Sequence, residues 1–135
     1  MIVDTSALLA FFHPREAHHG QVSALFAETR ESLIVSPYVL AELDYLILRR
    51  LGVRSEIEVL RAMLEPAWVI PHVTDAHLSR AADLVEAYAE HRVGVTDAVN
   101  VALAESYHTT KIATLDRRHF TILRLADSTL VEIVP

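Results

Sequence analysis

The chain has 135 residues, 52% of them hydrophobic, and a formal net charge of −6 at pH 7. This length and composition fit one domain, residues 1–135, with a sizeable core. The absence of cysteine excludes disulfides and thiol metal sites, and three scattered glycines exclude a Walker loop and a GxGxxG dinucleotide-binding motif. A polyanionic partner such as nucleic acid would need local basic patches or bound cations to offset the negative charge.

The amino-terminal residues, MIVDTS, lack the basic stretch of a secretory signal. No apolar run approaches the roughly 18 residues of a membrane span. A chain without cysteine also suits a reducing compartment. We therefore expect a soluble, cytoplasmic protein.

Short apolar runs alternate with helical stretches along the chain. In the first half, the pattern predicts strands over 1–3 and 33–35 and helices over 7–12, 22–30 and 38–51. Ser36-Pro37 is a strong start for the helix over 38–51, and Gly52 a plausible stop. This helix is apolar almost all round, so we expect most of it to be buried in the domain or in a partner interface.

The second half continues the alternation. It predicts strands over 67–70, 111–115 and 130–134, the last at a sheet edge, and helices over 55–65, 75–91 and 97–108. Apolar spacing predicts buried stripes at Ile57, Leu60 and Leu64 in the first of these helices, and at Leu78, Ala81, Val85 and Tyr88 in the second. Alternating strands and helices predict a parallel sheet of about five strands covered on both faces, an α/β fold.

Four acidic residues occupy corresponding places in this pattern. Asp4 and Asp116 directly follow strands, and Asp97 lies in the first turn of a helix that Thr96 can cap. Glu42 lies one to two turns into the helix after the second strand. Because right-handed crossovers bring these places to one edge of the sheet, we expect the four carboxylates to share one crevice.

Asp44 lies only two residues after Glu42, which turns its side chain by about 200° around the helix axis. Both acids therefore cannot face the same crevice. We expect Glu42 to face it, and Asp44 to have a salt-bridge partner on the other side.

Carboxylates in one crevice repel each other, by roughly 4 kcal/mol for two charges about 4 Å apart at an effective dielectric near 20. Either some of them are protonated or a multivalent cation binds. Oxygen ligands favour Mg²⁺ or Mn²⁺, and the eight histidines show no ligand spacing such as HExxH, so we assign none of them to metal. Such cations promote phosphodiester cleavage by activating water.

Four segments, MIVDTSALLAFF, SPYVLAELDYL, VTDAVNVALA and TLDRRHF, occur in an order and spacing that resemble the PIN-domain ribonucleases, specifically the VapC toxins of type II toxin–antitoxin systems. The resemblance covers essentially the full length. It implies a three-layer α/β/α PIN-like domain, Mg²⁺-dependent cleavage of structured RNA such as tRNA or rRNA, inhibition of translation, a homodimer and a cognate VapB-type antitoxin. It also implies that Asp4 and Asp97 hold the principal Mg²⁺, with Mn²⁺ a substitute, while Glu42 and Asp116 complete its shell or help to place a second ion.

Further polar residues near the four acids are candidates for orienting them or for binding substrate: Thr5, Ser6, Asn100, Thr114, Arg117 and Arg118. For the three hydroxyl residues, helix capping is an equal alternative. Asn100 lies one helical turn from Asp97 and can also be purely structural. The arginine pair can equally be an ordinary solvated loop, and Arg15, Arg49 and Arg50 are weaker candidates for contacts with substrate phosphates.

Other α/β classes also place an aspartate after the first strand. A haloacid-dehalogenase-type phosphatase needs a second aspartate at the position of Ser6, and a phosphorelay receiver needs one after the third strand, where this chain has Pro71-His72. A non-catalytic dimeric interaction module with the PIN fold predicts that the acids are lost. All four are present, which favours the nuclease.

Overall fold

The computed structural model describes all 135 residues. Five short strands alternate with seven α-helices and one short 3-10 helix, η1. None of the helices combines the length and the apolar character that crossing a membrane requires. In chain order the elements are β1 (Ile2–Val3), α1 (Thr5–Phe12), α2 (His19–Glu28), β2 (Leu33–Ile34), α3 (Pro37–Leu51), α4 (Val53–Ala62), β3 (Trp68–Val69), α5 (Asp75–Ala87), η1 (Ala89–His91), α6 (Val95–Ser106), β4 (Lys111–Ala113), α7 (Arg117–Phe120) and β5 (Glu132–Val134).

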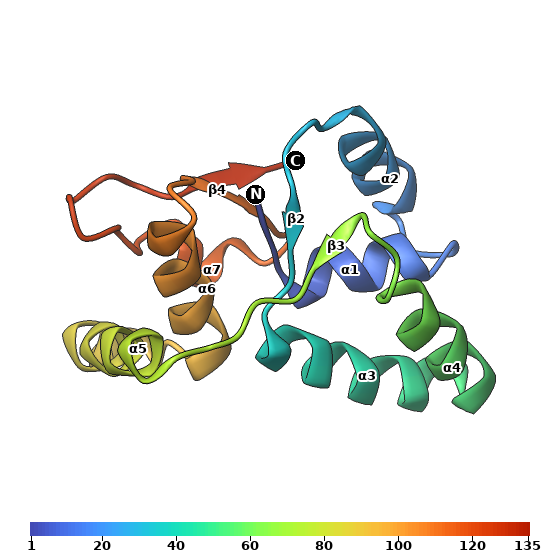
Figure 1. Ribbon diagram of the computed structural model, residues 1–135, viewed down its shortest axis with the longest axis horizontal. Coiled ribbons are helices and arrows are strands. Elements are labelled where there is room, and N and C mark those ends of the chain that lie inside the picture. The colour runs from blue at the N-terminus through green and yellow to red at the C-terminus, as the bar shows by residue number, and fades with distance from the viewer.

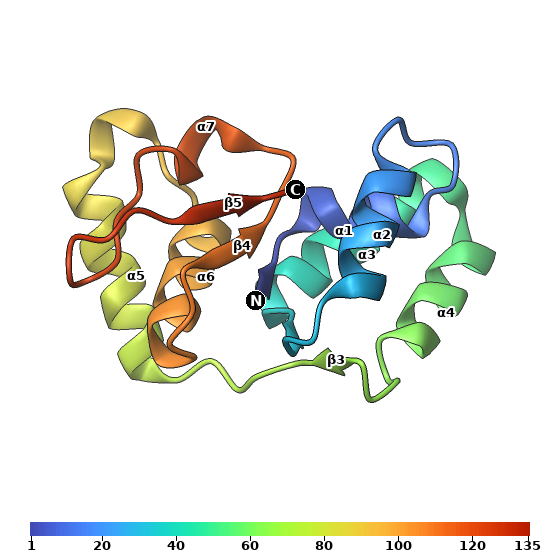
Figure 2. The ribbon, with the colours of Figure 1, turned by 90° about the horizontal axis from the view of Figure 1, so that it is seen from above.

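The strands form one parallel sheet in the order β3-β2-β1-β4-β5. Helices α1 to α4 cover one face of this sheet, and α5 to α7 cover the other (Figure 1, Figure 2). The three-layer α/β/α architecture with five parallel strands confirms the expectation from the sequence. The last strand, β5, lies at the edge, as its position in the chain predicts, and pairs only with β4.

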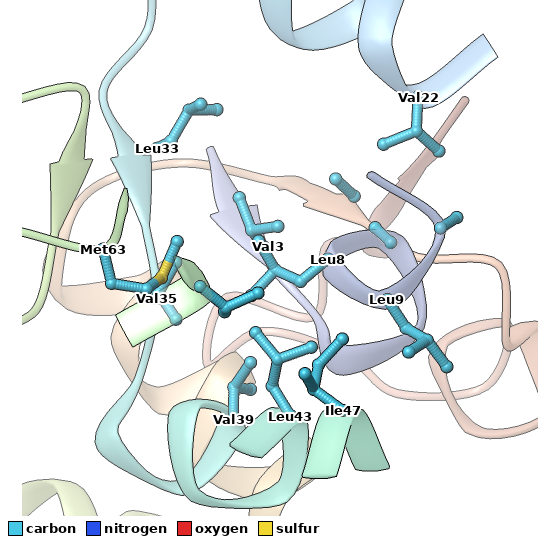
Figure 3. Packing of buried hydrophobic residues seen from close by; sticks show 14 of the residues in the cluster. Val3, Leu8, Leu9, Val22, Leu33, Val35, Val39, Leu43, Ile47 and Met63 are labelled. Atoms are coloured by element: carbon cyan, nitrogen blue, oxygen red, sulfur yellow. The ribbon is translucent and has the colours of Figure 1, made fainter. Parts of the chain in front are cut away.

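Successive side chains of each strand contribute to two separate hydrophobic cores, because they point to opposite faces of the sheet. On one face, Val3 of β1 and Leu33 of β2 pack with residues of α1 and α3 such as Leu8 and Leu43 (Figure 3). On the other face, Ile2 and its neighbours pack against α5, α6 and α7. The central strands are thus buried on both sides, which explains their uninterrupted apolar sequences.

Helix α3 has the boundaries that its sequence signals predict. The Ser36 hydroxyl accepts a hydrogen bond from the backbone N–H of Val39 at 3.1 Å, and Pro37 occupies the first turn. Gly52 ends the helix with a positive φ of 85°, a conformation that glycine adopts without strain. The helix is only partly buried, since Tyr45 and Leu48 on its outer face are exposed.

The predicted buried stripe of α4 was wrong. Ile57, Leu60 and Leu64 are exposed, Leu64 by 82%, whereas Val59 and Met63 are buried. Helix α4 is apolar on more than one side, and only its contact with α3 decides which side is covered.

The stripe predicted for α5 was correct only in part. Ala81 is buried, but Leu84 is the large side chain that enters the core, while Leu78 and Val85 flank it at the surface. A helix that packs mainly on one neighbouring helix, here α6, buries a narrow face.

Two predicted helix caps were also wrong. Asp4, not Thr5 or Ser6, is the N-cap of α1, and its carboxylate accepts from the backbone N–H of Ser6 at 3.5 Å. Gly94, without a side-chain hydrogen bond, is the N-cap of α6, so Thr96 lies inside the first turn. Each helix begins earlier than the sequence suggests, and the threonine and serine hydroxyls are therefore available for other contacts.

The correction to α4 can be tested with two neighbouring residues. Met63→Ala should lower the free energy of unfolding by about 2–5 kcal/mol, because it leaves a cavity beside α3. Leu64→Ala should lower it by no more than about 0.5 kcal/mol, because its side chain is in solvent. Urea denaturation of both variants measures the difference, and a larger loss for Leu64→Ala would contradict the described packing.

Candidate functional site

Strands β1 and β4 are neighbours in the sheet although 108 residues separate Val3 from Lys111 in the chain. The chain moves outward from β1 through β2 to β3 and then returns to the other side of β1 to form β4. Such a reversal of strand order creates a crevice at the carboxyl ends of the two strands. The backbone N–H of Asp4 donates to the carbonyl of Ala113 at 2.9 Å, which fixes the ends of β1 and β4 beside each other.

Asp4 is the most buried acid of the crevice, with only 5% of its surface exposed. Its Oδ2 accepts hydrogen bonds from the hydroxyls of Ser6 at 2.9 Å and Thr114 at 2.8 Å. Its Oδ1 accepts from the side-chain amide of Asn100 at 3.4 Å. These donors come from α1, α6 and the residue after β4, so the three elements together fix one carboxylate.

A cleft of about 550 Å³ opens beside Asp4. Asp4 itself is not among the lining residues, but Ser6, to which it is bonded, is. The walls carry both acidic and basic side chains and only two apolar ones. The lining residues are Thr5, Ser6, Leu9, Glu42, Leu46, Arg50, Arg92, Gly94, Thr96, Asp97, Asp116, Arg118 and His119.

Glu42 faces this cleft from α3, as the sequence predicts. The hydroxyl of Thr5 donates to its Oε2 at 2.6 Å, so Thr5 binds the acid rather than capping a helix. Asp44 faces the other way, again as expected, but it has no salt bridge. It meets the carboxyl group of Glu56 instead, and burial together with repulsion from Asp44 raises the pKa of Glu56.

Asp97 lies in the first turn of α6 and is held by a histidine. Its Oδ2 lies 2.6 Å from Nδ1 of His119 on α7. Burial raises the pKa of Asp97, and repulsion from Asp4 and Asp116 adds to the rise, while the contact with His119 offsets it in part. The charge of this carboxylate is therefore incompletely compensated within the protein.

The negative charge of Asp116 is compensated more fully than that of Asp97. It is the N-cap of α7, and its Oδ1 accepts from the backbone N–H of Arg118 at 3.1 Å. The guanidinium of Arg118 also binds both carboxylate oxygens, with Nε 3.0 Å from Oδ1. These contacts with Arg118 lower the pKa of Asp116.

The donor set suits a hard divalent cation, since it consists of carboxylate, hydroxyl and amide oxygens. The buried Oδ1 of Asn100 accepts no hydrogen bond, which leaves a free oxygen beside Asp4. The side chains are nevertheless not arranged as a ready chelate, because no three acidic or histidine groups surround a common point. Arg118 engages both carboxylate oxygens of Asp116, so Asp116 would have to release it to bind an ion directly, whereas only Oδ2 of Asp97 is engaged and its Oδ1 is free.

Basic residues proposed from the sequence for substrate contacts have different surroundings. Arg117 donates to the carbonyl of Pro135, and Arg49 lies over the ring of Tyr45 and donates to its hydroxyl. Neither residue lines the cleft, whereas Arg50 and Arg118 do. Arg15 is exposed and also lies outside the lining.

Two basic residues of the cleft, His119 and Arg92, were not predicted from the sequence. None of the histidines was assigned to a metal site, although the place of His119, three residues after Asp116 and within the TLDRRHF segment, was a usable signal for a residue of the cleft. Arg92 had no such signal, because it lies in the irregular turn before α6.

Comparisons with known proteins identify the family of the chain. The chain matches the PIN domain family over residues 1–125. It is 45% identical over 135 residues to Ribonuclease VapC26 of Mycobacterium tuberculosis, with 100% of both chains covered.

Two solved structures have a similar fold. One is the crystal structure of M. tuberculosis VapC20, a Sarcin-Ricin loop cleaving toxin, with a TM-score of 0.82 and 24% identity over 99% of this chain and 98% of that one. The other is a toxin–antitoxin complex from Klebsiella pneumoniae, with a TM-score of 0.70 and 16% identity over 90% of this chain and 91% of that one. The family match and the full-length relative confirm the resemblance found in the sequence. The chain belongs to the PIN domain family and, within it, to the VapC group.

Proposed function

We propose that this protein is a divalent-cation-dependent endoribonuclease, the toxin of a type II toxin–antitoxin pair. The full-length relationship to Ribonuclease VapC26 supports an RNA-cleaving activity. The observation that carries the proposal is the meeting of Asp4, Glu42, Asp97 and Asp116 at one crevice from four distant parts of the chain. Repulsion makes such a gathering unfavourable, so it points to a cationic cofactor.

Asp4 and Asp97 are the proposed principal ligands of the cation, and Glu42 and Asp116 the supporting ones. Mg²⁺ is the natural candidate and Mn²⁺ its substitute, because the donors are oxygens. When bound, such an ion supplies Lewis acidity, which polarises the scissile phosphate and makes a neighbouring water more acidic.

The protein's own contribution is to orient these groups. Ser6, Thr114 and Asn100 hold Asp4 in one position, and Thr5 holds Glu42. Asp4 and Glu42 are thus already fixed when a cation and a phosphate arrive, which is the general advantage of preorganised groups. His119 and Arg118 hold Asp97 and Asp116, and when released they would be free to contact the substrate phosphates.

Structured cellular RNA, tRNA or rRNA, is the proposed substrate, and its cleavage in the cytoplasm would inhibit translation. A cognate VapB-type antitoxin is the proposed inhibitor. A homodimer is the proposed state of the toxin. These expectations come from membership of the VapC group.

Asp4→Asn should reduce RNA cleavage at least about 100-fold, because it removes a charge from the proposed principal ligand pair while preserving its shape. Asp44→Asn is the matched control, since Asp44 faces away from the cleft, and it should cleave like the wild type. Sequencing of RNA 5′ ends after expression of each protein measures activity and identifies the target. Cleavage by Asp4→Asn at the wild-type rate would refute the proposal.

Mg²⁺ or Mn²⁺ should raise the melting temperature of the wild type. At one hundred times the dissociation constant, the linked stabilisation is about 2.7 kcal/mol. Asp4→Asn should lose most of this shift and Asp44→Asn should keep it, as followed by differential scanning calorimetry with and without EDTA. Equal shifts in all three proteins would show that the cation binds elsewhere.

Asp97→Asn should stabilise the cation-free protein at pH 7, because it removes an incompletely compensated buried charge. The raised pKa of Asp97 means that the folded state binds its proton more tightly than the unfolded state. Wild-type stability therefore recovers as the pH falls through this raised pKa toward the ordinary value of 3.8. The advantage of the variant should shrink over that window in urea denaturation with EDTA, and a constant difference from pH 7 to pH 4 would contradict the assignment.

A further inference from the structure

Four basic side chains line the cleft, and three of them are engaged by acids. Arg118 binds Asp116 and His119 binds Asp97, so these two serve the carboxylates. Arg50 forms a single longer contact, 3.4 Å, with Glu16. Arg92 forms no ion pair and no side-chain hydrogen bond, and it is exposed. It is the one guanidinium in the cleft whose N–H donors are all without a partner in the protein.

The backbone of Arg92 is unusual as well. Its φ is 53°, in the left-handed region that residues with a β-carbon rarely adopt. The turn is closed by a hydrogen bond from the Arg92 N–H to the carbonyl of Ala89 at 3.2 Å, and the next residue, Val93, is buried. Glycine or asparagine would suit this conformation better, and the arginine side chain makes no ion pair or hydrogen bond that would offset the difference. An unfavourable residue whose side chain has no partner points to a role outside the folding of the chain.

We propose that Arg92 is a substrate-binding residue that contacts a backbone phosphate of RNA on the α6 side of the carboxylates. This inference rests on the nuclease function proposed above. A chain with a net charge of −6, and with acids at its reactive centre, repels a polyanion unless local cations intervene. A guanidinium is suited to that task, because it stays charged and binds phosphate oxygens in pairs.

From its position, Arg92 can bind RNA without taking part in the proposed cleavage at the carboxylates. It lies just before the first turn of α6, which carries Asp97, whereas Glu42 and Arg50 line the cleft from α3. A phosphate held there would lie to one side of the carboxylate cluster. Arg92 would then fix the path of the RNA strand across the acids without binding the cation itself.

The test measures binding of a mixed-sequence, 20-nucleotide single-stranded RNA to proteins that all carry Asp4→Asn, so that the RNA is not cleaved. Three further substitutions are compared in this background: Arg92→Gly, Arg92→Lys and the control Arg54→Gln. Arg54 is an exposed arginine of α4 that pairs with Glu58 and does not line the cleft. Dissociation constants are measured by fluorescence anisotropy between about 50 and 200 mM KCl, and each melting temperature is recorded.

Arg92→Gly should weaken binding and reduce the slope of log affinity against log salt by about 0.7, the value for one lost phosphate contact on a single strand. Its melting temperature should be unchanged or higher, because glycine relieves the left-handed backbone. Arg92→Lys should retain most of the affinity, and Arg54→Gln all of it.

Affinity and salt slope equal to those of the Arg54→Gln control would overturn the role of Arg92 while leaving the nuclease proposal intact. A fall in melting temperature together with affinity would assign Arg92 a structural role instead. Failure of the Asp4→Asn parent protein to bind this RNA would overturn the role of Arg92 as a contact to single-stranded RNA, whereas absence of RNA cleavage by the wild type in the 5′-end sequencing described above would overturn the nuclease proposal itself.

Discussion

Repulsion among the acids at the β1–β4 edge is the constraint on which this structure depends. Asp4 is nearly buried and keeps its place because Ser6, Thr114 and Asn100 all donate to it. The neighbouring acids are held by basic partners from the following helix, α7, and one of them is still left with a raised pKa. This unfavourable arrangement is the basis of the proposal that the cleft binds a cation.

The fold produces this gathering through its strand order. A sheet in the order β3-β2-β1-β4-β5 brings the ends of β1 and β4 together. Asp4 directly follows β1, and Asp116 lies in the short loop after β4. Helices α3 and α6 then add one acid each, Glu42 from the second turn of α3 and Asp97 from the first turn of α6. The apolar layers on both faces make the strands rigid, and this rigidity lets short polar side chains meet at hydrogen-bonding distance.

Much of this arrangement could be predicted from the sequence because local rules decided it. Alternating strands and helices determine a parallel sheet, Ser36-Pro37 and Gly52 define α3, and the opposite orientation of Glu42 and Asp44 follows from helix geometry. Tertiary contacts decided the rest. The sequence of α4 offers more than one apolar face, and only packing against α3 selects Met63 over Leu64. Likewise, the turn that carries Arg92 has no sequence periodicity that could place it beside the acids.

The most direct test of the central claim is a crystal structure of the protein grown or soaked with Mn²⁺, with anomalous diffraction used to locate the ion. The account predicts a strong anomalous peak in the cleft, coordinated by Asp4 and Asp97. An ion bound only outside this cleft, or one in the cleft without Asp4 and Asp97 among its ligands, would contradict it.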